Sequence, residues 1–244
     1  MNYGKYIEDC IQSVLGQKAS FPFKINHIIM DGGSTDKTAE ILEKYSDKLH
    51  CYVNKGEGQT KALNHAMRII EREFPETEYI GWLNADDYYA LEWVESSLST
   101  SKHELHNVAA TCANYNQIRI LERSTGGFGF VEAKVTFQDQ RPYVDFKGLL
   151  ESNNICQPTI CIRLSAFVDV KERDGYYFNP RIDYCQDYEL WLRFLVHGYK
   201  ICRIRDYLAT LRQHPLSLSN THRERQGAEV KNLRAFMRSK SFRG

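Results

Sequence analysis

The chain has 244 residues, enough for one domain with a sizeable core or for a domain with a smaller elaboration. Its composition, 42% hydrophobic and 26% charged, is that of ordinary soluble globular proteins. The net charge of +1 lacks the strong basic excess of nucleic-acid-binding proteins, so we expect no nucleic acid partner.

The seven cysteines are scattered, odd in number and form no CxxC pair. This predicts neither a zinc ribbon nor a disulfide framework and favours a reducing compartment. No apolar stretch approaches the roughly 20 residues that span a bilayer, and no signal peptide leads the chain. We therefore expect a cytoplasmic protein.

Helical and strand-like patterns alternate over the first part of the chain. The expected elements are a helix at 5–16, a strand at 25–30, a helix at 39–45, a strand at 49–53, a helix at 59–73 and a strand at 79–83. This alternation predicts an α/β fold with a mostly parallel central sheet flanked by helices. Such a sheet normally begins with a strand, and this chain begins with a helix. We expect the first strand either to lie elsewhere in the sequence or to be absent from this chain.

The alternation of helical and strand-like patterns changes after residue 105. The expected elements are two strands within 108–124, a glycine-rich turn at 125–130, a strand at 157–163, a helix at 187–198 and a strand pair at 200–212. Trp82, Trp93 and Trp191 are expected in the core, where aromatic side chains dominate the packing.

Three aspartates follow two of the expected strands. Asp86 and Asp87 come after the strand at 79–83, and Asp31 comes after the strand at 25–30. Ligands of open α/β sheets bind at the carboxyl ends of the strands, so these carboxylates are expected on one rim. Adjacent carboxylates repel unless a cation or hydrogen-bond donors stabilise them, and Mg²⁺ or Mn²⁺ shared with phosphate oxygens does this. The alternative is a simple turn whose polar side chains bond their own backbone.

The segment "DGGSTDKTAEIL" that begins at Asp31 predicts a tight turn followed by a capped helix. It lacks the spacing of a Walker loop and of GxGxxG, which argues against kinases and dehydrogenases.

Six blocks occur in an order and spacing that carry more information than any one of them. They are "NYGKYIEDCIQSVLGQ", "IIMDGGSTDKTAEIL", "GEGQTKALNHAM", "YIGWLNADDYY", "QPTICIRLSAF" and "DYCQDYELWLRFLVHG". This series resembles family 2 glycosyltransferases with the GT-A fold, from Asn2 to about Ser219. The first strand of that family, which ends in "PSYN" or a similar sequence, is reduced here to Asn2 and Tyr3. We hypothesise that Met1 is not the natural start or that the product is impaired.

The resemblance implies roles for individual residues. Asp31 corresponds to the aspartate that bonds the nucleotide base, and Asp86 to a ligand of the ribose or metal. Asp87 corresponds to the ligand of the cation that bridges the diphosphate. Asp187 corresponds to the catalytic base, and the preceding position, often an acid in relatives, is Gln186 here. Local sequence alone instead favours Asp187 as an N-cap or first-turn acid of a helix.

Further site residues are implied by the same resemblance. Lys61 and Asn64 lie on the helix that the resemblance implies contacts the nucleotide. Relatives often carry an aspartate near position 57 or 61. This sequence has Glu57 and Lys61 at those positions and so departs from the family pattern. The segment "LRQHPLSLS" matches the closing R-x-H-x-x-S of the family. It makes Arg212 a candidate for the diphosphate and His214 a candidate for the diphosphate or metal, with a surface loop as the alternative.

The resemblance implies an inverting enzyme that uses Mn²⁺ or Mg²⁺ and a UDP-, GDP- or dTDP-sugar. The acceptor would be a saccharide or lipid-linked hydroxyl, in bacterial polysaccharide or glycoconjugate assembly. One rival is a sugar nucleotidyltransferase, which needs a glycine- and Lys/Arg-rich phosphate loop that is not found near the N-terminus. The other is a remnant that binds nucleotide without turnover.

The chain divides in this interpretation into a glycosyltransferase domain at 1–219 and a basic amphipathic helix at 220–244. Val230, Leu233, Phe236 and Met237 form an apolar stripe at helical spacing. The stripe either packs on the domain or rests on an anionic membrane at its inner face, close to a lipid-linked acceptor.

Overall fold

The computed structural model describes residues 1–56, 58–103, 107–122, 128–137, 141–172, 174–215 and 217–241. Its elements in chain order are α1 (Ile7–Leu15), β1 (Ile28–Asp31), α2 (Thr38–Lys44), β2 (His50–Val53), α3 (Gln59–Glu73), β3 (Tyr79–Gly81), β4 (Tyr88–Tyr89), α4 (Trp93–His103), β5 (Val108–Glu122), β6 (Phe128–Val135), α5 (Phe146–Glu151), the 3-10 helix η1 (Gln157–Thr159), β7 (Cys161–Arg163), α6 (Leu164–Asp169), α7 (Gln186–Val196), β8 (Lys200–Gln213), α8 (Leu218–Thr221) and α9 (Arg223–Ser241).

The alternation predicted for the first part of the chain is confirmed, and α3 coincides with the predicted helix at 59–73. Later predictions need correction. One long strand, β5, replaces the two strands expected within 108–124, and one strand, β8, replaces the pair at 200–212. Of the turn predicted at 125–130, residues 125–127 lie outside the described residues and 128–130 begin β6.

The sheet is mixed rather than mostly parallel. Its six-stranded part has the order β3-β7-β5-β8-β4, with β6 paired to β5 outside this path. Only the β5–β8 pairing within it is parallel. The pairings β3–β7, β4–β8, β5–β6 and β5–β7 are antiparallel. Because β8 bonds both β5 and β4, its far end lies beside the segment that follows β3.

Strands β1 and β2 form a separate parallel pair, in register from Ile28 with His50 to Asp31 with Val53. The strand pairs found among the described residues do not join this pair to the six-stranded sheet.

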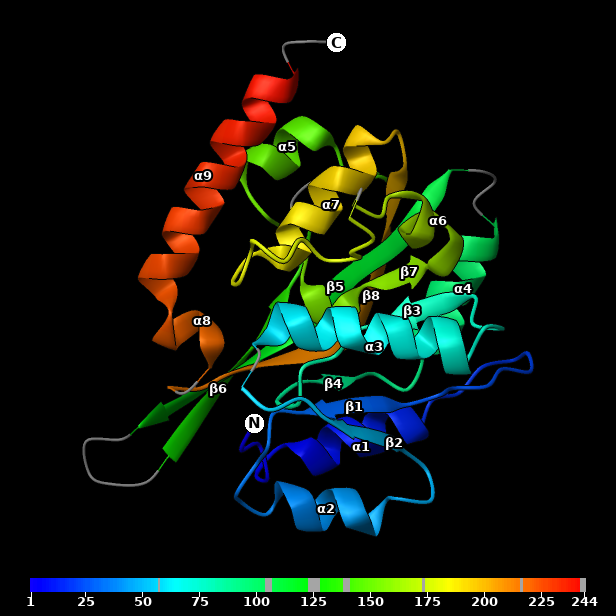
Figure 1. The fold of residues 1–244 in the computed structure, drawn as a ribbon, viewed down its shortest axis with the longest axis vertical. Coiled ribbons are helices and arrows are strands. Elements are labelled where there is room, and N and C mark those ends of the chain that lie inside the picture. The colour runs from blue at the N-terminus through cyan, green and yellow to red at the C-terminus, as the bar shows by residue number, and fades with distance from the viewer. Residues whose placement is uncertain are drawn as a thin grey trace.

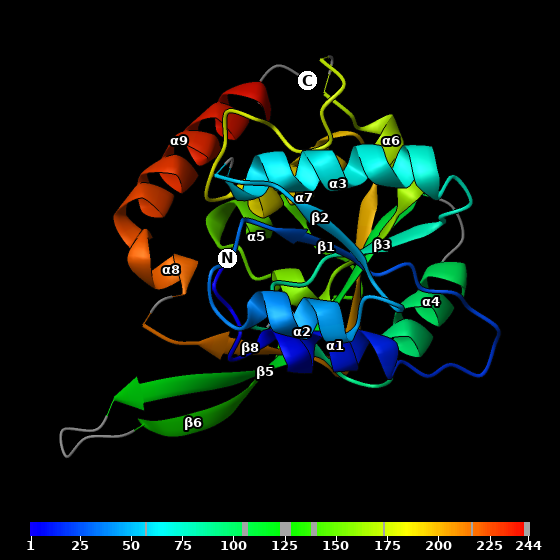
Figure 2. The same cartoon turned by 60° about the horizontal axis from the view of Figure 1, so that its bottom comes forward.

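Helices cover the strands from several sides. Figure 1 shows α3 crossing in front of the sheet and α1 and α2 lying beside β1 and β2. The β5–β6 hairpin projects from the body, as Figure 2 shows from a second direction.

The predicted core tryptophans are buried: Trp82, Trp93 and Trp191 are 8%, 7% and 0% exposed. Their packing also explains a glycine at the end of β3, because a Cβ atom on Gly81 would lie 2.6 Å from the Trp93 ring. The close approach of this ring therefore requires glycine where the carboxylate-bearing segment begins.

Helix α9 packs on the domain through its apolar stripe. Leu233 and Met237 are buried in the largest core cluster, with Val230 packed against it, whereas Phe236 is half exposed. Within the described parts of the chain, no helix combines the length and apolar character needed to cross a membrane.

Candidate active site

The carboxylate pair lies in the turn between β3 and β4. Asp86 and Asp87 are both buried, with exposed fractions of 8% and 1%. The backbone N–H of Arg212, on β8, donates to Oδ1 of Asp87 at 2.9 Å. The side-chain amide of Asn84 lies 3.4 Å from Oδ2 of Asp87. The pair is thus enclosed by the end of β8 rather than exposed in an open turn.

This enclosure changes the acidity of Asp87. Burial, followed by the charge of Asp86, raises the pKa of the Asp87 carboxyl well above its ordinary range. The hydrogen bonds from Arg212 and Asn84 oppose this shift. A nearby cation would favour the ionised form, which makes the pair a suitable place for positive charge.

His214 contacts the other member of the pair. Its Nε2 atom lies 3.2 Å from Oδ2 of Asp86, and the side chain is buried. The imidazole stacks on the ring of Tyr6 at a centroid distance of 4.9 Å and meets the edge of Tyr3 at 6.1 Å. Its backbone N–H donates to Oγ of Ser217 at 3.0 Å, so the R-x-H-x-x-S segment folds into a turn against the site.

The guanidinium of Arg212 is already engaged. It forms an ion pair with Asp9 on α1, donates to the backbone carbonyl of Asp86 at 3.2 Å, and lies over the rings of Tyr6 and Tyr88. A diphosphate at this position would compete with Asp9 for the same donors.

Asp31 ends β1 and holds the turn that follows. Its carboxylate accepts hydrogen bonds from the backbone N–H and the hydroxyl of Ser34, at 2.9 and 2.6 Å. The Ser34 hydroxyl oxygen accepts in turn from the backbone N–H of Asn2 at 2.8 Å. Residues Asn2 to Tyr6 therefore connect the Asp31 turn with the ring contacts of His214.

Asp187 lies in the first turn of α7 and is partly buried. Burial raises the pKa of its carboxyl to about 6, although the backbone N–H of Tyr188 donates to it at 2.7 Å. The charges of Asp87 and Asp187 both contribute to the raised pKa of the Cys156 thiol, after burial itself. Cys156 thus lies within the electrostatic reach of both aspartates.

A chain of side-chain amides links the carboxylate pair to α7. The Gln157 amide donates to the backbone carbonyl of Trp82, and Asn84 donates to Oε1 of Gln157 at 3.0 Å. Gln59 then donates to Oδ1 of Asn84 at 3.0 Å, and Gln186 donates to Oε1 of Gln59 at 2.8 Å. The sequence did not predict this chain, because it joins segments far apart along the polypeptide.

The direction of every hydrogen bond in this chain of amides is fixed by the backbone carbonyl of Trp82 at one end. A backbone carbonyl only accepts, so Gln157 must turn its NH₂ group toward Trp82 and its oxygen toward Asn84. The same argument passes through Asn84 and Gln59 to Gln186, whose NH₂ group donates. Its Oε1 atom is buried and has no hydrogen-bond partner among the described residues.

Lys61 and Asn64, the two residues of α3 predicted to bind the nucleotide, lie in different environments. Lys61 is exposed in the first turn of α3. Asn64 is buried: its amide nitrogen donates to the carbonyls of Thr60 and Phe178, and its oxygen accepts from the N–H groups of Tyr177 and Phe178. These bonds leave Asn64 no group for a nucleotide, and we remove it from the candidate site. Glu57 lies outside the described residues.

Within the described ranges, no three His, Cys, Asp or Glu side chains are arranged to hold a metal ion by themselves. The donors at the site are the carboxylates of Asp86 and Asp87 and the imidazole of His214. Mg²⁺ and Mn²⁺ are commonly held by one or two carboxylates together with substrate phosphates. The residues therefore fit a cation shared with a diphosphate, and not a cage made by the protein alone.

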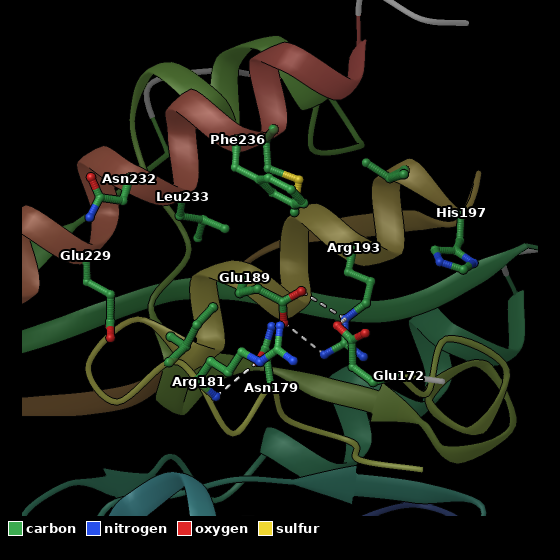
Figure 3. Close-up of a pocket in the computed structure, with 13 residues that line it drawn as sticks. Glu172, Asn179, Arg181, Glu189, Arg193, His197, Glu229, Asn232, Leu233 and Phe236 are labelled. Carbon is green, nitrogen blue, oxygen red and sulfur yellow. Dashed lines mark hydrogen bonds and ion pairs between the residues drawn. The ribbon is translucent and has the colours of Figure 1, made fainter. Parts of the chain in front are cut away.

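A separate pocket of about 520 Å³ lies between α7, α9 and the segment that precedes α7 (Figure 3). Its walls include the buried ion pair of Glu189 and Arg193, with an N···O distance of 2.9 Å. Asp86, Asp87 and Asp187 do not line it, so it is distinct from the candidate active site.

The α/β fold, with a mixed sheet flanked by helices, is the fold of the GT-A class. The family model "Glycosyl transferase family 2" matches residues 1–152, and the chain belongs to this family. This match confirms the resemblance to family 2 glycosyltransferases found in the sequence.

Individual relatives agree with this assignment. The chain is 28% identical over 226 residues to TuaG of Bacillus subtilis, named for teichuronic acid biosynthesis, covering 90% of this chain and 78% of TuaG. It is 28% identical over 201 residues to the Escherichia coli UDP-Glc:alpha-D-GlcNAc-diphosphoundecaprenol beta-1,3-glucosyltransferase WfaP, covering 79% and 68%. It spans only 56% of an uncharacterized glycosyltransferase of Rickettsia typhi, to which it is 25% identical.

Among solved structures, residues 1–349 of Staphylococcus aureus TarS in complex with UDP superpose with a TM-score of 0.61. The identity is 21%, and the superposition covers 97% of this chain and 62% of the TarS chain. At this identity the likeness establishes the fold, and it confirms the predicted fold class.

Proposed function

We propose that this protein transfers a sugar, with inversion, from a nucleoside-diphosphate donor to an acceptor hydroxyl, assisted by a divalent cation. The observation that carries the proposal is the amide chain from the turn of Asp87 to Gln186. It ties the carboxylate pair to Gln186 at the start of α7, and this contact supports a site that Asp187, the next residue, would share. Family membership supports the class of reaction.

The donor side is built from the ends of β1, β3 and β8. Asp31 would bond the nucleotide base, and Asp86 would contact the ribose or the cation. Asp87, with His214 as a further ligand, would hold Mn²⁺ or Mg²⁺ against the diphosphate, and this cation would stabilise the negative charge of the leaving group. Arg212 would bond the diphosphate in place of its ion pair with Asp9. Lys61 stays a candidate for binding the nucleotide.

The acceptor side centres on Asp187. Its carboxylate would remove the proton of the acceptor hydroxyl while that oxygen forms a bond to the anomeric carbon. The bond from this carbon to the diphosphate oxygen breaks on the opposite face, so the configuration inverts. The products are the glycoside, the nucleoside diphosphate and a protonated Asp187. A well-placed base of this kind typically contributes ~10²–10⁴-fold to the rate.

We propose a UDP-sugar as the donor, because UDP is bound in the TarS structure and named in the donor of WfaP. A saccharide or lipid-linked acceptor in bacterial polysaccharide assembly follows from the names of WfaP and TuaG. A place at the inner face of the membrane, with contact through the basic side of α9, belongs to the same proposal. So does a division of the chain at residues 219 and 220.

The test is release of nucleotide from a panel of UDP-, GDP- and dTDP-sugars with Mn²⁺, for this chain and for Asp187→Asn. We expect turnover with a UDP-sugar that falls by ~10²-fold or more in the variant. Full turnover in Asp187→Asn would remove the base from the proposal. Tight UDP binding without turnover in either protein would instead support a nucleotide-binding remnant.

A further inference from the structure

The segment Asp183–Cys185 directly precedes α7, and its backbone N–H groups are bonded by one carboxylate from far along the chain. Oε1 of Glu229, on α9, accepts from the N–H of Asp183 at 2.8 Å. Oε2 of Glu229 accepts from the N–H groups of Tyr184 and Cys185, at 2.7 and 2.9 Å. Figure 3 shows Glu229 projecting from α9 toward this segment.

Three donors on one carboxylate form an unusually firm contact. Successive backbone N–H groups make a concave site that favours an anion, and bonds to a charged acceptor are about twice as strong as neutral ones. Here the anion is part of the protein. The contact therefore fixes the backbone up to the residue before Gln186.

Other contacts between α9 and the same region agree with this role. The Gln226 amide donates to the carbonyl of Tyr184 at 3.1 Å, and the Tyr184 ring stacks on His222 at 5.1 Å. Beyond Asp187, the guanidinium of Arg234 donates to the hydroxyl of Tyr188 at 3.1 Å. The first turn of α7 is thus held by α9 on both sides of Asp187.

We propose that Glu229 is a positioning residue for catalysis, which sets the place and direction of Asp187 through the backbone of Asp183–Cys185. The inference rests on the proposed function, because it assumes that Asp187 accepts the proton. It assigns α9, which lies outside the segment matched by the family model, a part in the reaction. In this proposal Glu229 acts through its bonds to the backbone and not by contact with the donor or the acceptor.

The experiment compares Glu229→Gln with Glu224→Gln. Glu224 is exposed on the same helix and loses the same charge. In Glu229→Gln the side-chain NH₂ group would oppose the backbone donors and loosen the segment. We expect kcat for the UDP-sugar to fall ~10- to 100-fold, because small displacements of a reacting group are costly. The KM for the UDP-sugar should change less than about twofold, since the donor contacts lie elsewhere.

Hydrogen exchange and a conservative variant complete the test. The amides of Tyr184 and Cys185 should exchange faster in Glu229→Gln than in Glu224→Gln, below the Tm of both proteins. Glu229→Asp, which keeps the charge on a shorter side chain, should recover part of kcat. Faster exchange with unchanged kcat would mean that Glu229 only stabilises the fold, and would overturn the inference.

The outcome for Asp187→Asn separates the two proposals. If that variant is inactive while Glu229→Gln turns over as fast as Glu224→Gln, only the positioning role is wrong. If Asp187→Asn keeps full turnover, or the unmodified chain shows none, the proposed function fails and the positioning role fails with it.

Discussion

The backbone N–H of Arg212 donates a hydrogen bond to Oδ1 of Asp87 at 2.9 Å, across 125 positions of sequence. This bond joins the end of β8 to the turn after β3. Because it comes from the backbone, it survives any substitution at position 212 except proline. It also keeps Asp87 buried beside Asp86, which is why the acidity of Asp87 and the stability of the protein are coupled.

We expect Asp87 to destabilise the metal-free protein as the pH rises. Its pKa is raised in the folded protein and close to about 4 in the unfolded chain. Between these values the folded protein binds a proton that the unfolded chain has lost, so stability falls with increasing pH. Asp87→Asn removes this dependence, and its Tm at pH 8 without divalent cations should exceed that of the unmodified protein by several degrees.

Asp47→Asn is the control, since Asp47 is exposed and should leave the pH dependence of the Tm unchanged. Mn²⁺ with UDP should raise the Tm of the unmodified protein at pH 8, and much less that of Asp87→Asn. Equal losses of Tm from pH 5 to pH 8 in the unmodified protein and Asp87→Asn would show that Asp87 is not the group responsible.

The pH dependence of turnover should report Asp187. Burial raises the pKa of this carboxyl to about 6, and only the ionised form accepts a proton. We expect kcat/KM to rise about tenfold per pH unit below this value and to level above it, at saturating Mn²⁺. Asp187→Asn should show low activity without this limb. A limb near pH 4 in the unmodified protein would contradict the burial of Asp187.

Asp9 and a bound diphosphate should compete for Arg212. The Asp9 side chain is largely exposed, and such a pair is worth ~0.2–1 kcal/mol. Asp9→Asn should therefore tighten UDP binding by up to about fivefold, whereas Arg212→Lys should weaken it by losing the planar fork. Titration calorimetry with UDP and Mn²⁺ measures both. Weaker binding in Asp9→Asn would show that Asp9 organises Arg212 for a structural purpose only.

The sequence predicted those parts of the fold that local pattern controls. Helix α3 follows from a clear apolar period, and the fold class follows from the alternation of helices and strands. The direction of β8 was not predictable, because β5 is parallel to β8 and antiparallel to β7 through contacts that no local pattern encodes. The residues of η1 looked like a strand, although Pro158 lacks the N–H that a central strand needs.

The part of the candidate site that lies in sequence motifs was predictable. The part that depends on packing between distant segments was not. Asp86, Asp87 and His214 were named from sequence, and the structure places His214 against Asp86. The role of Asn84 and the three backbone bonds of Glu229 depend on contacts between distant segments, and their residue types are common on any surface. Asn64 is the opposite case, because it lies on the helix expected to contact the nucleotide and its amide is hydrogen-bonded to backbone groups.

The fixed direction of the amide chain gives a prediction for Gln186. In Gln186→Glu, an ionised carboxylate has no hydrogen to donate to Oε1 of Gln59. Turning the Gln59 amide does not help, because its oxygen would then oppose that of Asn84, and the conflict would pass on to the carbonyl of Trp82. One buried acceptor stays unpaired, at a cost of about 1–3 kcal/mol.

This cost should depend on pH in a way that identifies its cause. A protonated Glu at position 186 carries an O–H group that donates to Gln59, so the loss of Tm in Gln186→Glu should be large at pH 8 and small at pH 4.5. Gln186→Met removes donor and acceptor together and should lose stability by the same amount at both pH values. Thermal unfolding of the three proteins at both pH values decides the question. If the Tm of Gln186→Glu equals that of the unmodified protein at pH 8, the hydrogen bonds of the amide chain do not run from Gln186 toward Trp82.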